Sequence, residues 1–226
     1  MTISISAALV AAAVVLFPAA IDGAKVERRF KLGEADSYAV SATMEMGGVA
    51  GKAVGNVSIK ALKLGKDDAA EVELSLSSFS LELGGSDTGA ASPEKQSVLL
   101  DKRGVPGRLE VKEASWIYAI VLLAGYCPGE VETGKEFPIE WSTKDKSLSV
   151  KGAGKLVEIQ DVAGEKVAVI KGKIKVNVAD DVPGEIEYTS KISVSSGKLL
   201  SSEGKLRIED GTTAAFTVKK DKPSDK

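Results

Sequence analysis

The residue types in this chain exclude several kinds of chemistry. The 226 residues contain no histidine and one cysteine, Cys127. A Ser-His-Asp triad, a Cys-His pair and an imidazole-ligated metal site therefore cannot be formed, and one thiol cannot build a thiolate cluster. The lone Cys127 also cannot form an internal disulfide, and the simplest interpretation is a small buried hydrophobic side chain. The sequence predicts no metal site and no cofactor.

Carboxylates are the remaining groups that could catalyse a reaction. A pair of acids can hydrolyse a glycosidic bond if an aromatic-lined cleft holds them at the right separation. Glu113 and Glu140 are the two acids nominated for this role. Other acids fall in apparent turns, where their spacing matches no known calcium loop, namely Asp67, Asp68, Asp180, Asp181 and Glu185. A solvated turn is the favoured interpretation of that set.

Aromatic residues cluster in the middle of the chain. Both tryptophans lie there, together with two tyrosines and a phenylalanine. Aromatic side chains line most small-molecule pockets, so this region is the candidate for binding a ligand. The candidate ligand-binding residues are Trp116, Ile117, Ile120, Leu123 and Trp141. The alternative is that the same residues form an ordinary core.

The segment ASWIYAIVLLAGYCP, residues 114–128, has no charged side chain from Trp116 to Cys127. Read as a helix over about 114–127, it is apolar on every face, which is typical of a buried helix. Twelve residues span only about 18 Å, so this segment is too short to cross a bilayer. Two short buried strands are the alternative interpretation.

Period-two alternation of apolar and polar residues dominates the rest of the chain. Val72, Leu74 and Leu76 alternate with polar residues, and Gly/Asp/Ser turns separate such runs. This pattern is typical of half-buried antiparallel strands. The expected fold is mainly β, with antiparallel curved sheets or a half-barrel and one buried helix.

An internal repeat is suggested when residues 71–83 are aligned with residues 166–178. The parity of the apolar residues changes at Ser77-Ser78 in the first segment and at Gly172-Lys173 in the second. A parity change within a strand needs one extra residue, so a β-bulge is expected at both places.

Two tandem related copies are therefore expected, over 25–112 and 129–220. The apolar helix connects them over 113–128, and residues 221–226 form a disordered tail. One closed barrel and two β subdomains both remain compatible with this pattern.

The first twenty residues carry no charged side chain. The run Ala7 to Phe17 has the length of a signal-peptide apolar region, which predicts a signal peptide over 1–24 and a periplasmic or extracellular protein. An uncleaved anchor is the alternative, because Met1 to Ile21 could just span a bilayer. Lys25 and the two arginines that follow it argue against that anchor.

The charge balance gives a further exclusion. Thirty Lys and Arg against thirty-two Asp and Glu leave a net charge of −2. No basic stripe is apparent, so nucleic acid is not an expected partner. No transmembrane segment is expected in the mature chain.

Several motifs resemble a family of uncharacterised exported bacterial β proteins. They are RFKLGEADSYAVSATMEM (29–46), GVPGRLEV (104–111), ETGKEFPIEWS (132–142) and SSGKLLSSEGKL (195–206). A Cys-Pro stands at 127–128 where family members tend to have Leu-Pro. The resemblance implies export and a β fold, and it implies no activity. A curved sheet with an apolar helix on its concave side also resembles, by loose analogy, the half-barrel of bacterial lipoprotein carriers.

These observations favour a non-enzymatic exported protein that binds an apolar small molecule or lipid between sheet and helix. The first alternative is a structural or protein-interaction module of the cell envelope. The second is a hydrolase that uses Glu113 and Glu140.

Overall fold

The structure is a computed structural model that describes residues 23–90, 94–110, 116–178 and 182–221. The strands of the N-terminal half are β1 (Gly23–Val26), β2 (Ala35–Met46), β3 (Val49–Leu64), β4 (Ala70–Leu83), β5 (Ser86–Ala90) and β6 (Glu94–Leu100). The helix α1 (Trp116–Ala124) follows. The remaining strands are β7 (Gly129–Glu132), β8 (Glu136–Ser142), β9 (Leu148–Val162), β10 (Glu165–Val178), β11 (Val182–Ser193), β12 (Leu199–Ile208) and β13 (Thr213–Lys220).

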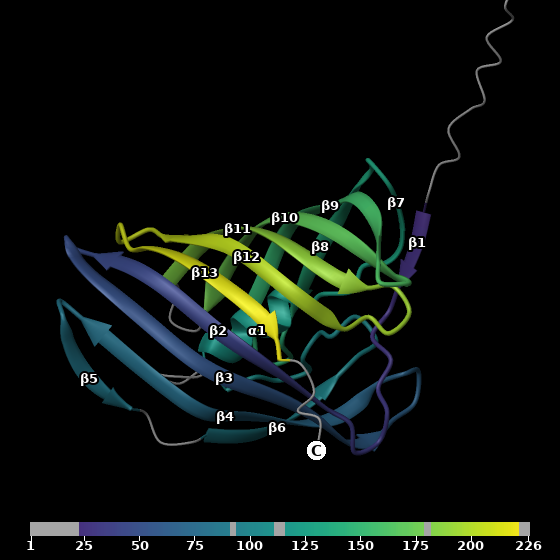
Figure 1. Ribbon diagram of the computed structural model, residues 1–226, viewed down its shortest axis with the longest axis horizontal. Coiled ribbons are helices and arrows are strands. Elements are labelled where there is room, and N and C mark those ends of the chain that lie inside the picture. Colours follow the sequence, from purple (N-terminus) through teal and green to yellow (C-terminus); the bar gives the residue numbers. More distant parts are fainter. Residues whose placement is uncertain (1–22, 91–93, 111–115, 179–181, 222–226) are drawn as a thin grey trace, which may run out of the picture.

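One large antiparallel sheet makes up most of the described chain. Its strand order is β5-β4-β3-β2-β13-β12-β11-β10-β9-β8, with β6 also paired to β4. In Figure 1 the yellow β13 lies between β2 and β12 and joins the two halves of the chain. The sheet curves but does not close. In the described residues its two edge strands, β8 and β5, are not paired with each other. The expected mainly β, antiparallel and curved fold is confirmed.

The core lies on the inner, concave face of this sheet. Alternate residues of each strand point inward, as Tyr38, Val40 and Ala42 do in β2, with exposures of 0 to 3%. Helix α1 packs on this face against β2, β3 and β11, and its residues from Ile117 to Ala124 are all buried. The buried apolar helix is thus confirmed for Trp116–Ala124, and residues 114 and 115 lie outside the described part. No helix in the described part of the chain is long and apolar enough to cross a membrane.

One of the two expected bulges is present. In the β3–β4 pairing, Asn56 faces Ser78 and Val57 faces Leu76, so Ser77 is the extra residue. The parity change there reverses which residues of β4 point inward, as the sequence predicts.

The prediction of a second bulge at Gly172-Lys173 was wrong. The pairing of β10 with β11 runs without a register shift from Val167 to Val178. The irregularity lies instead in β9, where Val157 is the extra residue opposite Val169 and Ile170. The parity appeared to change because Val167 and Val169 are buried away from the main core, so β10 is apolar on both faces there.

The two-copy organisation is not confirmed. Both halves contribute to one continuous sheet, with β13 and β12 between β2 and β11. The boundary expected at 112–113 lies outside the described residues, as do residues 1–22 of the expected signal peptide and 222–226 of the expected tail. Gly23 and Ala24, also assigned to that peptide, belong to β1, which pairs with β7. The division into copies stays a prediction.

Glycines paired with aromatic rings cross the inner face of the sheet. Tyr188 faces Gly172 on one side and Gly204 on the other. A Cβ added to Gly172 would lie 2.4 Å from the Tyr188 ring, and one added to Gly204 would lie 2.5 Å from the Phe216 ring. A ring can lie over a neighbouring strand where that strand has no side chain, and glycines in strands also permit sharp bends. This row is one physical source of the sheet's curvature.

Candidate functional site

The helix residues expected to bind a ligand lie in the core. Ile117, Ile120 and Leu123 are 1%, 6% and 4% exposed. Ile117 packs directly over Gly55 of β3, where a Cβ would lie 3.1 Å from its Cδ1 atom. In this structure the three side chains are part of the hydrophobic core, and their role in binding a ligand stays a prediction.

The two tryptophans occupy different positions. Trp116 is partly buried, and its ring meets Phe79 of β4 edge to face, with centroids 6.5 Å apart. Trp141 lies on the edge strand β8 opposite Val150 and is 8% exposed. Its indole N–H has no acceptor among the described residues. The aromatic cluster of the sequence is therefore divided between the helix segment and the edge strand β8.

The helix leaves part of the inner face uncovered. Nine helical residues extend only about 13 Å, whereas the strands of the sheet are longer. Beyond Trp116, a row of small and apolar inner residues is only partly buried. This row, called the apolar strip below, runs across five neighbouring strands and consists of Leu206, Ala214, Met44, Gly51 and Leu83.

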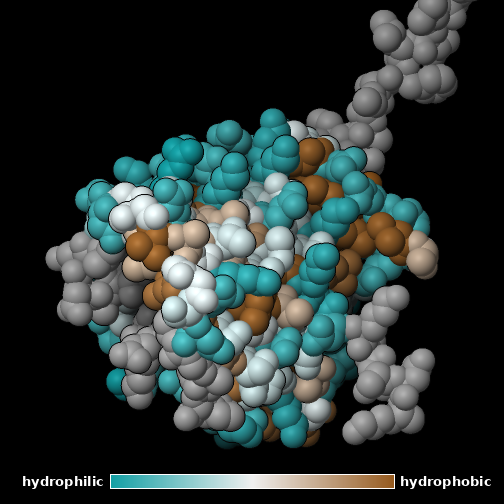
Figure 2. Space-filling view, turned by 60° about the vertical axis from the view of Figure 1, so that its left-hand side comes forward, coloured by the Kyte–Doolittle hydropathy of each residue, from teal (hydrophilic) through white to brown (hydrophobic). Residues whose placement is uncertain are grey.

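Side chains of the apolar strip converge. A Cβ placed on Gly51 would lie 2.6 Å from Cδ2 of Leu83 and 2.9 Å from Cγ of Met44, so both side chains lean over this glycine. Met46 and Val49 extend the strip at the β2–β3 turn and are 44% and 47% exposed. Figure 2 brings this end of the molecule forward and shows hydrophobic residues among hydrophilic ones in the middle of the face.

Sequence reasoning missed the apolar strip. Its residues alternate with polar ones like the inner residues of any half-buried strand. What distinguishes them is that they lie beyond Trp116, where α1 begins, so the helix does not cover them. This depends on where the helix lies in the tertiary structure. Met44 and Met46 in the motif ATMEM were the available signal, because methionine is common at adaptable binding surfaces.

The carboxylates nominated for hydrolysis are not brought together in the described residues. The Glu140 side chain is 67% exposed and lies 3.7 Å from the ammonium group of Lys151. Glu113 lies outside the described part. The described residues also contain no group of three or more acidic or thiol side chains placed to hold a metal ion.

A buried ionic cluster lies near the start of β2. Arg28 and Asp36 are 5% and 7% exposed, and the guanidinium donates to the carboxylate at 3.2 Å. Lys198 and Lys220 also approach Asp36, at 3.2 and 2.8 Å. Burial raises the pKa of Asp36, but the hydrogen bond from Lys220 and the charge of Arg28 outweigh it, so the pKa is lowered. The cluster ties the segment before β2 to the end of β13 and has the character of a structural lock.

Cys127 is fully buried beside this cluster. Its thiol donates to the carbonyl oxygen of Gly197 at 3.2 Å. Burial raises the pKa of Cys127 to about 12, so the thiol stays protonated at neutral pH. The interpretation of Cys127 as a small buried side chain agrees with this position.

Comparisons with known proteins give remote structural neighbours. No family model and no curated protein matches the chain. A DUF1329 family protein from Desulfovibrio piger aligns over 84% of this chain and 87% of its own, with 9% identity and a TM-score of 0.28. A putative outer membrane lipoprotein-sorting protein domain from Vibrio parahaemolyticus aligns over 87% and 89%, with 8% identity and a TM-score of 0.23. A LolA superfamily protein from Nitrosomonas europaea aligns over 86% and 90%, with 11% identity and a TM-score of 0.21.

These neighbours are consistent with the resemblance to an uncharacterised β family and with the loose analogy to lipoprotein carriers. Because all three TM-scores are below 0.3, no functional property is transferred from them. What this chain binds is inferred from its own residues.

Proposed function

We propose that this protein is a non-enzymatic binding protein that takes up a long acyl chain on the apolar strip. The observation that carries the proposal is the row of half-buried apolar residues on the inner face, beyond the N-terminal residue of α1, Trp116. Trp116 and Phe79, which meet edge to face, form the apolar boundary between this strip and the helix.

The dimensions of the strip suit an extended hydrocarbon chain. Five strands have four gaps of about 4.8 Å, so the strip is about 19 Å long. Burying ten methylene groups would contribute roughly 8 kcal/mol of favourable binding free energy, before the entropic cost of association is subtracted. This gross contribution is large enough to support binding.

The charge of the surrounding inner face favours a neutral chain over a polar ligand. The neighbouring row toward the helix consists of Tyr188, Gly204, Phe216, Ala42, Ala53 and Leu81. None of these side chains is charged, and none would compensate a buried ionic group. The head group of a lipid is therefore expected to stay outside the strip.

An exported location supports a lipid-binding role. The apolar run Ala7 to Phe17 has the length of a signal-peptide apolar region. The proposed location is periplasmic or extracellular, where an apolar molecule needs a protein to cross water.

The test is binding of palmitate or a fluorescent long-chain fatty acid. Tryptophan fluorescence monitors the binding of palmitate, and displacement of the fluorescent fatty acid gives a second readout. The double variant Met44→Gln/Leu206→Gln places two amides in the strip, and we expect affinity to fall roughly tenfold or more. The matched control is Val54→Gln/Leu99→Gln, since these side chains are 38% and 52% exposed and lie on the outer face.

Two outcomes would contradict the proposal. One is an equal loss of affinity in the strip variant and the control variant. The other is a wild-type protein that fails to bind any long-chain fatty acid while remaining folded by circular dichroism. Co-purification of a stoichiometric protein partner on the strip would favour an interaction module instead.

A further inference from the structure

A second candidate binding surface lies on the opposite, outer face of the sheet. A hollow of about 1240 Å³ extends over β8 to β13. Among the described residues lining it are six lysines and four glutamates. The lysines are Lys151, Lys155, Lys171, Lys173, Lys175 and Lys205.

Lysines face lysines across β9 and β10. Lys155 is directly opposite Lys171, and Lys151 is directly opposite Lys175. Side chains in such positions have Cβ atoms about 5 Å apart, and like charges there are unfavourable. The sheet therefore holds two pairs of cations together.

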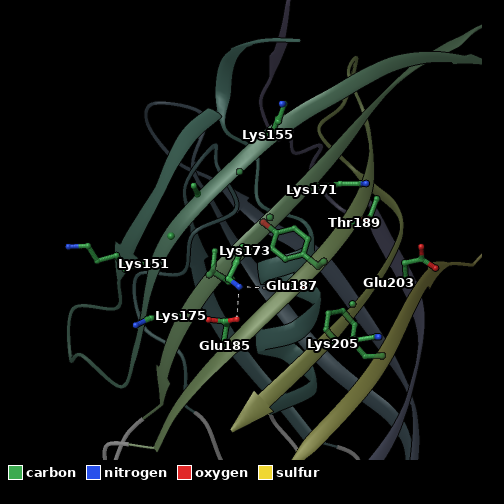
Figure 3. Close-up of a pocket in the computed structure, with 18 of the residues that line it drawn as sticks. Lys151, Lys155, Lys171, Lys173, Lys175, Glu185, Glu187, Thr189, Glu203 and Lys205 are labelled. Carbon is green, nitrogen blue, oxygen red and sulfur yellow. Dashed lines mark hydrogen bonds and ion pairs between the residues drawn. The ribbon is translucent and has the colours of Figure 1, made fainter. Parts of the chain in front are cut away.

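Carboxylates pair most closely with the middle of the hollow. Lys173 lies 2.9 Å from Glu185 and 2.8 Å from Glu187. Figure 3 marks these interactions with dashed lines. Hydrogen bonds to both carboxylates raise the pKa of Lys173 to about 12.

At the ends of the hollow, Lys151 has Glu140 at 3.7 Å, and Lys155 and Lys175 stand opposite Glu136 and Glu185 in the strand register without forming an ion pair. Within the described chain, Lys155, Lys171 and Lys175 have no carboxylate within 4 Å.

The two cationic ends are far apart. Lys171 and Lys175 are four residues apart on one strand, so their Cα atoms are about 14 Å apart. A single phosphate or carboxylate cannot reach both ends. A chain that carries repeated anionic groups can reach both ends at once.

We propose that this hollow binds an extended polyanion, a chain with repeated phosphate or carboxylate groups that contacts the lysines at both ends. The anionic groups relieve the repulsion between the opposed lysines, and the neutralised Lys173 lies between the two contacts. This surface is separate from the apolar strip, since its lysines point outward from the sheet.

The probe is medium-chain inorganic polyphosphate, titrated calorimetrically at low ionic strength and again at about 0.15 M salt. Binding is expected to weaken as salt rises. The double variant Lys171→Gln/Lys175→Gln should bind roughly tenfold more weakly than wild type. The matched control is Lys52→Gln/Lys60→Gln, which removes the same charge from exposed positions on β3 and should leave affinity within about twofold.

Three results would overturn the proposal. They are the absence of polyphosphate binding at low salt, an equal loss in both double variants, and equal affinity for orthophosphate and polyphosphate. Binding to anionic vesicles that matches polyphosphate in strength and in sensitivity to Lys171→Gln/Lys175→Gln would assign the surface to membranes instead. Polyglutamate in place of polyphosphate separates phosphate from carboxylate as the favoured group.

Discussion

Replacing Gly172 with alanine tests the glycine–aromatic row most directly. The new Cβ would lie 2.4 Å from Cε1 and Cζ of Tyr188 and 2.7 Å from its hydroxyl oxygen. The Tyr188 side chain is 6% exposed, so its ring has little space into which to move. Overpacking of this kind costs about 1–3 kcal/mol.

The expected change in melting temperature follows from the size of the chain. For a domain of about 200 residues, 1 kcal/mol corresponds to roughly 2–4 °C. A cost of about 2 kcal/mol therefore lowers the melting temperature by about 4–8 °C. The control is Gly107→Ala, whose nearest contact is the Leu99 carbonyl oxygen at 3.7 Å, and it should change stability by less than about 0.5 kcal/mol.

A double-mutant cycle distinguishes a steric clash from a general loss of strand stability. Tyr188→Val removes the ring and should cost about 3 kcal/mol by itself. Because the clash disappears with the ring, Gly172→Ala/Tyr188→Val should cost at least about 1 kcal/mol less than the sum of the single variants. Urea unfolding followed by tryptophan fluorescence measures all three. Strict additivity, or a neutral Gly172→Ala, would refute the reasoning.

Three further predictions concern the ionic cluster, the thiol and the bulge. Asp36→Asn leaves the buried Arg28 without its carboxylate partner and should cost about 3–5 kcal/mol at pH 7 in urea unfolding. Because the folded pKa of Asp36 lies below its ordinary value of 3.8, its contribution is complete above that pH and is lost as the pH falls toward the folded pKa. Wild type should thus lose stability in acid more steeply than Asp36→Asn, and parallel pH profiles would contradict this assignment. The pKa of Cys127 is raised to about 12. The native thiol should therefore resist a thiol-specific chromophore at pH 8 and react once urea unfolds the chain. Rapid labelling of the native protein would contradict this and show that the site opens. Deleting Ser77 removes the extra residue of β4 and should abolish cooperative unfolding. The control Ser77→Ala keeps the extra residue and should unfold like wild type. A cooperative unfolding transition in the deletion variant would argue against the bulge.

Local patterns in the sequence predicted the elements well. The strand alternation and the uncharged run around Ile120 depend on whether each residue faces water or protein, and the structure confirms both the strands and the buried helix. The bulge at Ser77 was also predictable, because a strand with one buried face can change parity only by inserting a residue. The same rule failed at Gly172-Lys173 because Val167 and Val169 are buried on the other face.

The candidate surfaces were not predictable in the same way. The apolar strip depends on where α1 begins relative to Met44 and Leu83. The lysine-lined hollow on the outer face depends on Lys155 of β9 lying opposite Lys171 of β10. Both need the register between strands, which the alternation of a single strand does not contain. Trp141 and Trp116 are close in sequence, yet they belong to an edge strand and to the helix.

The insertion of β13 between β2 and β12 has a consequence for how the chain folds. Thr217 of β13 and Ser41 of β2 share a hydrogen bond of 2.8 Å although 176 residues separate them. Contacts this distant in sequence slow folding, because a long loop must close before they form. As the chain emerges from a ribosome or a translocation pore, β2 keeps an open edge until β13 arrives. An open strand edge can pair with other chains. The edge of β2, which lies in the centre of the finished sheet, is therefore the part of the nascent protein that most needs a chaperone.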